Sequence, residues 1–149
     1  MDDRGVLVDD HPDTVRLVIP PSSQYLRTVR LVAADAAVRA GLDCEEIEDF
    51  RIAIDELCHL LMTATDEFIE VTLATLDHRV FGHGHARSRP SPAPRVLGEL
   101  SQLILASTTD SHTVNDIDGE MTFDVAKRTR RAADREPRVP ANSEAADQR

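Results

Sequence analysis

The sequence predicts an α/β two-layer sandwich in which a mostly antiparallel sheet carries helices on one face. Three observations predict it. Segments with alternating apolar residues come in adjacent pairs, helical patterns separate the pairs, and the order of elements is β-α-α-β-β-α-β-β. With 149 residues, 41% of them hydrophobic, the chain is long enough for one domain with its own core. Aromatic residues are only 3%, so we expect that core to be aliphatic.

The first strand is predicted at residues 14–19, where apolar residues alternate until two prolines end the pattern. A serine at position 22 or 23 then caps a helix that is predicted to run to about Ala40. Gly41 follows at the position where glycine commonly stops a helix.

The second helix has the clearest start. Asp43 and Glu46 have the spacing of a capping box, and acidic residues fill the first turn, where the helix dipole favours them. Apolar residues at helical spacing predict its buried face: Ile47, Phe50, Ile54, Leu57 and Leu61.

The second half of the chain predicts two hairpins with a helix between them. Residues 68–74 and 78–86 alternate on either side of a turn near Asp77. A loop with three prolines, 86–95, leads to a third helix marked by apolar residues from 96 to 104. A hairpin that turns at 116–119 closes the domain.

Charge is unevenly distributed. Seventeen Lys and Arg against 27 Asp and Glu give −10; residues 1–127 carry 11 basic and 23 acidic side chains (−12), and residues 128–149 carry six and four (+2). We therefore predict a flexible acidic lead-in at 1–13, a domain at 14–127 and a disordered Arg-rich tail at 128–149. So acidic a body argues against nucleic-acid and membrane partners. Two cysteines and no leader or long apolar run favour a cytoplasmic protein.

Two segments carry a family resemblance. Residues 16–62 combine a strand ending in proline, an Arg-bearing helix ending in glycine, and the pattern E-D-x-x-I-A-x-x-E; residues 99–114 precede a hairpin ending in Phe-Asp-Val-Ala-Lys. In these features the chain resembles, over roughly 14–127, bacterial anti-sigma-factor serine kinases of the partner-switching type. The resemblance implies a histidine-kinase-like ATPase fold (GHKL, or Bergerat). It also implies a protein partner, either a sigma factor or an anti-anti-sigma factor.

The sequence departs from the family at the nucleotide site. In the family, a Glu on the second helix polarises the attacking group and an Asn four residues later coordinates Mg²⁺. Glu56 matches the Glu, but Leu60 stands at the Asn position and offers no oxygen to a metal. The family's adenine-binding Asp motif corresponds to 82–89, which contains no Asp. Its glycine-rich lid corresponds to 86–95, which has three prolines and no glycine.

We therefore predict an anti-sigma-factor-like regulatory protein that acts by binding a protein, without kinase activity and without a cofactor or metal. In the family the first helix contributes to the sigma-factor surface or to a homodimer contact. Arg27 and Arg30, three apart on that helix, are thus the candidate partner residues, and a solvated surface is an equal alternative. The alternative function is an active serine/threonine protein kinase or ATPase whose Mg-ATP site is modified around Glu56.

His83 and His85 share one face of a predicted strand, where two imidazoles could bind Zn²⁺ or Cu²⁺. A site needs at least one further ligand. His78 is the nearest candidate, but it is an odd number of residues away from both and so would point to the other face of the strand. We predict no metal site there.

Overall fold

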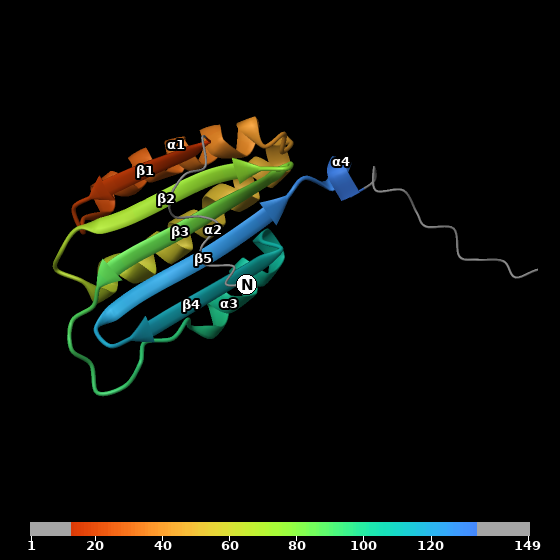
Figure 1. The fold of residues 1–149 in the computed structure, drawn as a ribbon. Helices are drawn as coiled ribbons and strands as arrows, with labels where there is room; N and C mark the ends of the chain where they lie inside the picture. Colours follow the sequence, from red (N-terminus) through yellow and green to blue (C-terminus); the bar gives the residue numbers. More distant parts are fainter. Residues whose placement is uncertain (1–12, 134–149) are drawn as a thin grey trace, which may run out of the picture.

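The computed structural model describes residues 13–133 and confirms the predicted fold class. Five antiparallel strands form one sheet in the order β1-β2-β3-β5-β4, and the helices α1, α2 and α3 lie against one face of it (Figure 1). The strands are β1 (Thr14–Ile19), β2 (Ile69–Leu76), β3 (Arg79–Arg87), β4 (Ser111–Ile117) and β5 (Glu120–Arg128). The helices are η2 (Ser23–Tyr25), α1 (Leu26–Arg39), α2 (Cys44–Ala64), α3 (Glu99–Thr108) and α4 (Arg130–Ala133).

Two tight turns set the register of the hairpins. Asp77 and His78 join β2 to β3 with φ of 49° and 62°, and Asp118 and Gly119 join β4 to β5 with φ of 53° and 77°. Two consecutive residues with positive φ are typical of the type I′ turn, whose twist matches that of the strands it joins. Each hairpin therefore places one set of alternate residues toward the helices.

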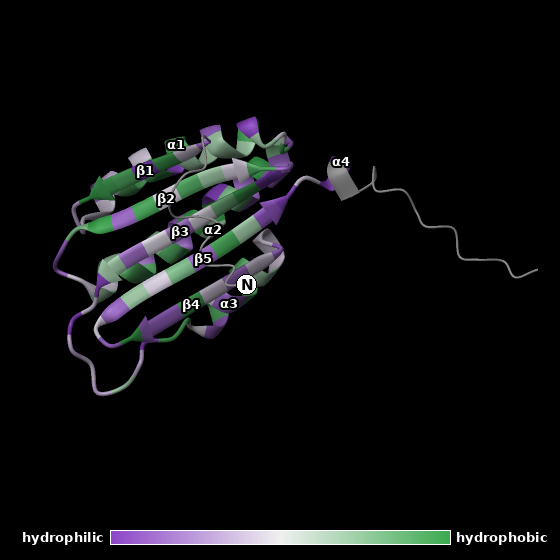
Figure 2. Cartoon of the chain, viewed as in Figure 1, coloured by the Kyte–Doolittle hydropathy of each residue, from purple (hydrophilic) through white to green (hydrophobic). Residues whose placement is uncertain are grey.

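Buried and less buried residues alternate along β3, and hydrophilic residues form separate bands on this strand (Figure 2). His83 and His85 face away from the helices, and Gly82 and Gly84 face them. A Cβ on Gly84 would lie 2.2 Å from Cε1 of Phe123, and one on Gly82 would lie 2.6 Å from a side chain of α2. These glycines therefore allow close packing of the core against the sheet.

The twelve largest of the fully buried side chains come from both layers. They are Phe50, Phe123, Ile54, Leu57, Leu61, Ile69, Leu73, Leu105, Met121, Glu46, Val29 and Val71. As predicted, aliphatic residues dominate. Between residues 13 and 133, no helix has both the length and the apolar character needed to cross a bilayer.

Some element boundaries differ from the prediction. The first helix opens with the 3₁₀ turn η2 before α1 begins at Leu26. The prediction that the third helix begins near Val96 is wrong, because the chain remains extended at Gly98 (ψ 162°) and α3 begins at Glu99. The apolar residues before it line a surface hollow instead.

Strand β5 continues to Arg128, and α4 begins at Arg130, so this part of the predicted tail has regular structure apart from Thr129. The backbone N–H of Arg128 donates to the Asp110 carboxylate at 2.5 Å, and that of Arg130 donates to Glu46 at 2.7 Å. Residues 1–12 of the predicted lead-in and 134–149 of the predicted tail lie outside the described residues.

Candidate functional site

The two positions of the family's nucleotide motif lie one turn apart on α2, next to α3. The hydroxyl of Ser101, in the first turn of α3, donates to Oε2 of Glu56 at 3.0 Å. Leu60 is partly buried and packs against the core. Helix α3 therefore contacts α2 where the family would hold the phosphates of a nucleotide.

The residues at this place lack the magnesium ligand of the family motif. The Leu60 side chain has no ligand atom, and one oxygen of Glu56 already accepts a hydrogen bond from α3. Residues 13–133 contain no group of three His, Cys, Asp or Glu side chains arranged to hold a metal ion. Neither the surface hollow beside α3 nor the one beside the proline loop is lined by Glu56 or Leu60.

The segment between β3 and α3, which corresponds to the family's lid, is fixed to the end of α2. The backbone N–H of Arg89 donates to the carbonyl oxygen of Ala64 at 2.8 Å. Its guanidinium donates to the carbonyl oxygen of Thr63 at 2.5 Å and to Asp66 at 2.9 Å. One arginine thus links this loop to three residues at the C-terminal end of α2.

Asp116 of β4 fixes the same loop from the other side. Its Oδ2 accepts the backbone N–H of Arg95 at 2.7 Å, and its Oδ1 accepts the hydroxyl of Ser88 at 3.0 Å; the carboxylate is only 8% exposed. The bond from the Arg95 backbone is the main reason why the pKa of Asp116 lies below its usual value. Burial opposes that shift, while Ser88 and the Arg95 guanidinium reinforce it. The loop is therefore held on both sides.

Arg27 and Arg30 of α1 have different surroundings. Nε of Arg30 lies 3.4 Å from Oδ1 of Asp55 on α2, so this arginine joins the two helices. Arg27 is exposed and forms no ion pair with any residue in the described part of the chain. Beside it on α1, Leu31 is 64% exposed and Val38 is 58% exposed. The outer face of α1 thus has one available arginine and two exposed aliphatic side chains.

Comparison with known proteins adds to this geometry. No protein-family model matches the chain. A serine-protein kinase RsbW of Halalkalibacterium halodurans is 36% identical over 47 residues, which are 32% of this chain and 29% of that protein. The RsbW of Bacillus pumilus is 39% identical over 46 residues, 31% of this chain and 28% of that protein. The matches thus span less than a third of the length of each curated relative.

A solved structure of the RsbU and RsbW domains of a Mycobacterium tuberculosis protein has the same fold. It superposes with a TM-score of 0.60 at 19% identity, covering 77% of this chain and 31% of that one. The chain is RsbW-like in fold and in part of its sequence. The predicted resemblance is therefore confirmed, as a divergent one.

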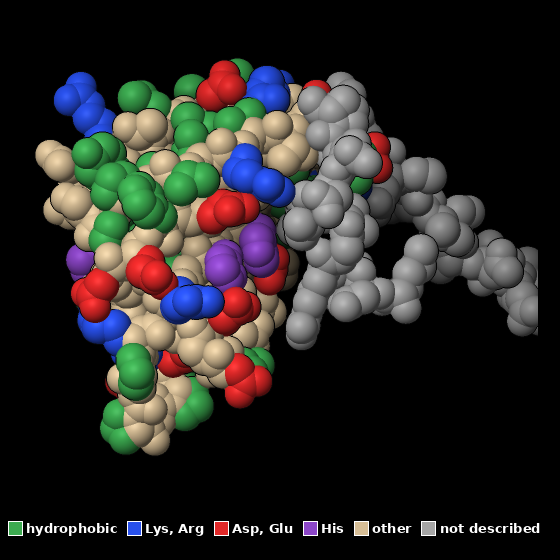
Figure 3. Space-filling view, turned by 60° about the vertical axis from the view of Figure 1, so that its left-hand side comes forward, with side chains coloured by type: hydrophobic (Ala, Val, Ile, Leu, Met, Phe, Trp, Pro, Cys, Tyr) green, Lys and Arg blue, Asp and Glu red, His purple; other side chains and the backbone are tan. Residues whose placement is uncertain are grey.

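On the face of this RsbW-like sheet away from the helices, the two predicted histidines pair with carboxylates of β5. Nδ1 of His83 lies 2.8 Å from Asp124, and Nε2 of His85 lies 3.4 Å from Glu120. Figure 3 shows histidines side by side among acidic and basic side chains. Each imidazole has its own carboxylate, so the geometry here is that of two separate pairs.

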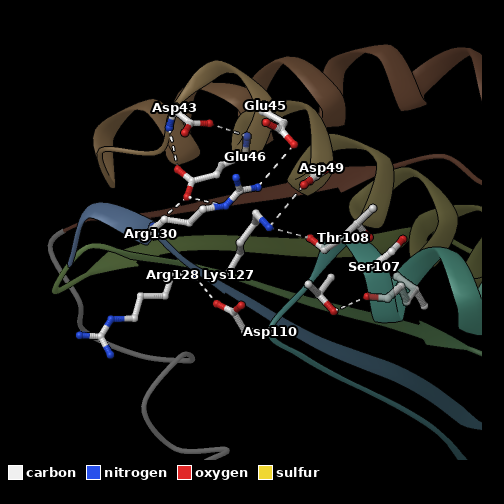
Figure 4. A network of polar contacts seen from close by, with 12 residues as sticks. Asp43, Glu45, Glu46, Asp49, Ser107, Thr108, Asp110, Lys127, Arg128 and Arg130 are labelled. Carbon is white, nitrogen blue, oxygen red and sulfur yellow. Dashed lines mark hydrogen bonds and ion pairs between the residues drawn. The ribbon is translucent and has the colours of Figure 1, made fainter. Parts of the chain in front are cut away.

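A buried lysine joins the RsbW-like sheet to α2 and α3 (Figure 4). Nζ of Lys127, on β5, donates to the carbonyl oxygen of Thr108 at 3.2 Å and lies 3.6 Å from Oδ2 of Asp49. Only 9% of the lysine side chain is exposed. A charge so buried must be paired, and this one is.

Next to it, Glu46 has two structural roles. The predicted capping box is present: Asp43 accepts the N–H of Glu46 at 2.9 Å, and Oε2 of Glu46 accepts the N–H of Asp43 at 2.8 Å. The second oxygen of Glu46 accepts the backbone N–H of Arg130, 84 residues away. The sequence predicted the first contact from local spacing, whereas no local pattern signals the second.

Proposed function

We propose that this chain is an RsbW-like regulator that binds a sigma factor, or the antagonist of one, and acts by covering the surface of that partner. In this proposal it transfers no phosphate and needs no nucleotide. The observation that carries the proposal is the contact of Ser101 with Glu56 beside Leu60. Where a kinase needs an open carboxylate and a metal ligand, this chain has a packed helix interface.

The fixed loop supports the same proposal. A lid must release its contacts to admit a nucleotide and then close over it. Here Arg89 links the corresponding segment to α2, and Asp116 links it to β4. Opening would therefore break hydrogen bonds at both ends of the segment.

The outer face of α1 is the proposed partner surface. Leu31 and Val38 can be buried on binding, which contributes about 25 cal/mol for each Å² of apolar area removed from water. Between residues 13 and 133, Arg27 forms no ion pair that binding would have to break, so it can meet an acidic group of the partner. A second copy of the chain on this face would give a homodimer.

A thermal melt with and without Mg-ATP tests the nucleotide part of the proposal. A ligand at 100 times its Kd stabilises a folded protein by about 2.7 kcal/mol, which for this size is a rise of roughly 5–10 °C. We expect no rise for the wild type at millimolar Mg-ATP. A clear rise would contradict the proposal and favour the alternative, a kinase or ATPase with a modified site. Loss of phosphotransfer in Glu56→Ala would then establish that alternative.

Direct binding tests the partner part. Purified sigma factors and anti-anti-sigma proteins encoded by the same genome are titrated against the wild type, Arg27→Glu and Leu31→Asp. Val18→Asp, at an exposed apolar residue of β1, is the matched control. We expect both α1 variants to bind about tenfold or more weakly and the control to bind normally. If none of these proteins binds the wild type, the proposed function is wrong. If all variants bind as tightly as the wild type, the proposal that the outer face of α1 is the binding surface is wrong.

A further inference from the structure

Strand β4 is one edge of the sheet, next to β5 alone. The two-residue turn at Asp118 and Gly119 makes Ile117 and Glu120 a hydrogen-bonded pair, and such pairs recur at every second residue. The residues between them, among them His112 and Val114, therefore direct their backbone N–H and C=O groups away from β5.

No backbone hydrogen bond from elsewhere in residues 13–133 reaches those groups of His112 and Val114. Natural sheets usually protect such an edge with Lys, Pro or a covering loop. The other edge has such devices, since β1 carries Arg16 and is followed by Pro20. Strand β4, Ser-His-Thr-Val-Asn-Asp-Ile, contains no Pro, Lys or Arg, and the loop contact of Arg95 reaches only its far end, at Asp116.

A hollow of about 740 Å³ lies beside this open stretch, between β4 and the outer face of α3. Its apolar lining comes from three segments, the loop before α3, α3 itself and β4. These residues are Val96, Leu97, Leu103, Ala106 and Val114. Val96 is 78% exposed and Leu103 is 69% exposed, so a substantial apolar surface here faces water.

One basic and one acidic residue line the hollow, Arg95 and Glu99, and Arg95 is already paired with Asp116 at 3.5 Å. Between residues 96 and 127 the single basic residue is Lys127, which is buried against Asp49. The same stretch contains six acidic residues: Glu99, Asp110, Asp116, Asp118, Glu120 and Asp124. A segment that binds here gains from positive charge.

We infer that β4 accepts an extended, basic segment of a partner protein as a sixth strand of the sheet. The backbone of that segment pairs with His112 and Val114. Every second side chain is apolar and enters the hollow beside Leu103. The side chains between them are Lys or Arg and lie on the other face of the sheet, where β5 carries Glu120 and Asp124. The inference is independent of the α1 surface and of the nucleotide question.

The probe is an N-terminally fluorescein-labelled heptapeptide, Lys-Val-Lys-Val-Lys-Val-Lys, titrated with the full chain by fluorescence anisotropy. We expect saturable binding, with Leu103→Asp binding about tenfold or more weakly. Val18→Asp on β1, a similarly exposed aliphatic residue outside the hollow, should bind like the wild type. A peptide with Glu for Lys should bind about tenfold or more weakly, as should one methylated at the backbone nitrogens of the valines.

Hydrogen exchange provides a second measurement. Saturating peptide should slow exchange of the His112 and Val114 amides about tenfold or more and leave the amides of β1 unchanged. Absence of saturable binding, binding unaffected by Leu103→Asp, or equal binding of the Glu peptide would each overturn the inference. A dimer seen by sedimentation of the wild type that Leu103→Asp converts to a monomer would also overturn it, because the occupant would then be a second copy.

Discussion

Replacement of Glu46 by alanine is expected to lower the free energy of unfolding by about 3 kcal/mol, because one buried carboxylate accepts two backbone hydrogen bonds. The side chain is 1% exposed, and its oxygens lie 2.8 Å from the N of Asp43 and 2.7 Å from the N of Arg130. Hydrogen bonds to charged groups contribute about 1.5–3 kcal/mol each. The Asp43 and Arg130 ends of these two hydrogen bonds are less buried than Glu46, so we use about 1.5 kcal/mol for each bond.

Far-UV circular dichroism melts measure the effect. For a chain of this size, about 3 kcal/mol corresponds to a fall in Tm of roughly 6–12 °C. Glu45→Ala is the matched control, because Glu45 pairs with the same Arg130 at 3.6 Å, but the two side chains are 74% and 62% exposed. An exposed pair contributes about 0–1 kcal/mol, so the control should melt within about 4 °C of the wild type. Equal midpoints for the two variants would refute the reasoning.

Three further changes have defined outcomes. Gly84→Ala would place a Cβ 2.2 Å from an aromatic carbon and should cost about 1–3 kcal/mol or more; an unchanged Tm would contradict that packing. Asp116→Asn should make stability less sensitive to acid. A carboxyl whose folded pKa is lowered by a backbone hydrogen bond, as the Arg95 N–H lowers that of Asp116, stabilises fully above its unfolded pKa and loses this as pH falls through the folded pKa. Urea titrations at a series of pH values from about 6 to 2 measure the free energy of unfolding of both proteins. If it fell equally with pH in the wild type and in Asp116→Asn, the prediction would be wrong. Iodoacetamide should label exposed Cys44 but not Cys58 in the folded chain, because burial raises the pKa of Cys58 to about 12; two labels by mass spectrometry would exclude this.

The parts of the fold that follow from neighbouring residues were predictable. The alternation at 14–19 predicted β1 at its observed bounds, and the spacing of Asp43 and Glu46 predicted the capping box. The start of α3 was not predictable in this way. Val96 and Leu97 continue the apolar spacing of that helix, but they line a hollow beside β4. Periodicity cannot distinguish a helix face from a loop that packs against a strand.

For the candidate site, the sequence predicted which residues occupy the motif positions but not which other residues they contact. The spacing of Glu56 and Leu60 identified the departure from the family motif. What occupies that place depends on Ser101, 45 residues away, and on Arg89, which reaches back to the end of α2. Arg27 and Arg30 share a helix but have different neighbours, because Asp55 of a different helix lies beside Arg30. Contacts between elements distant in sequence determine which polar side chains are already paired within the chain, and spacing along one helix does not indicate them.

Leu60→Asn separates the two consequences of that departure. Leu60 is partly buried against the core, so loss of its apolar side chain should cost stability whether or not a nucleotide binds. Leu60→Ala gives that packing cost without adding a ligand atom, and the two variants should have similar midpoints in the absence of nucleotide. If Mg-ATP then raises the midpoint of Leu60→Asn alone, one missing oxygen is what excludes the nucleotide. If it raises neither, the Ser101–Glu56 contact and the fixed loop also have to open, as expected for a site that has become a helix interface.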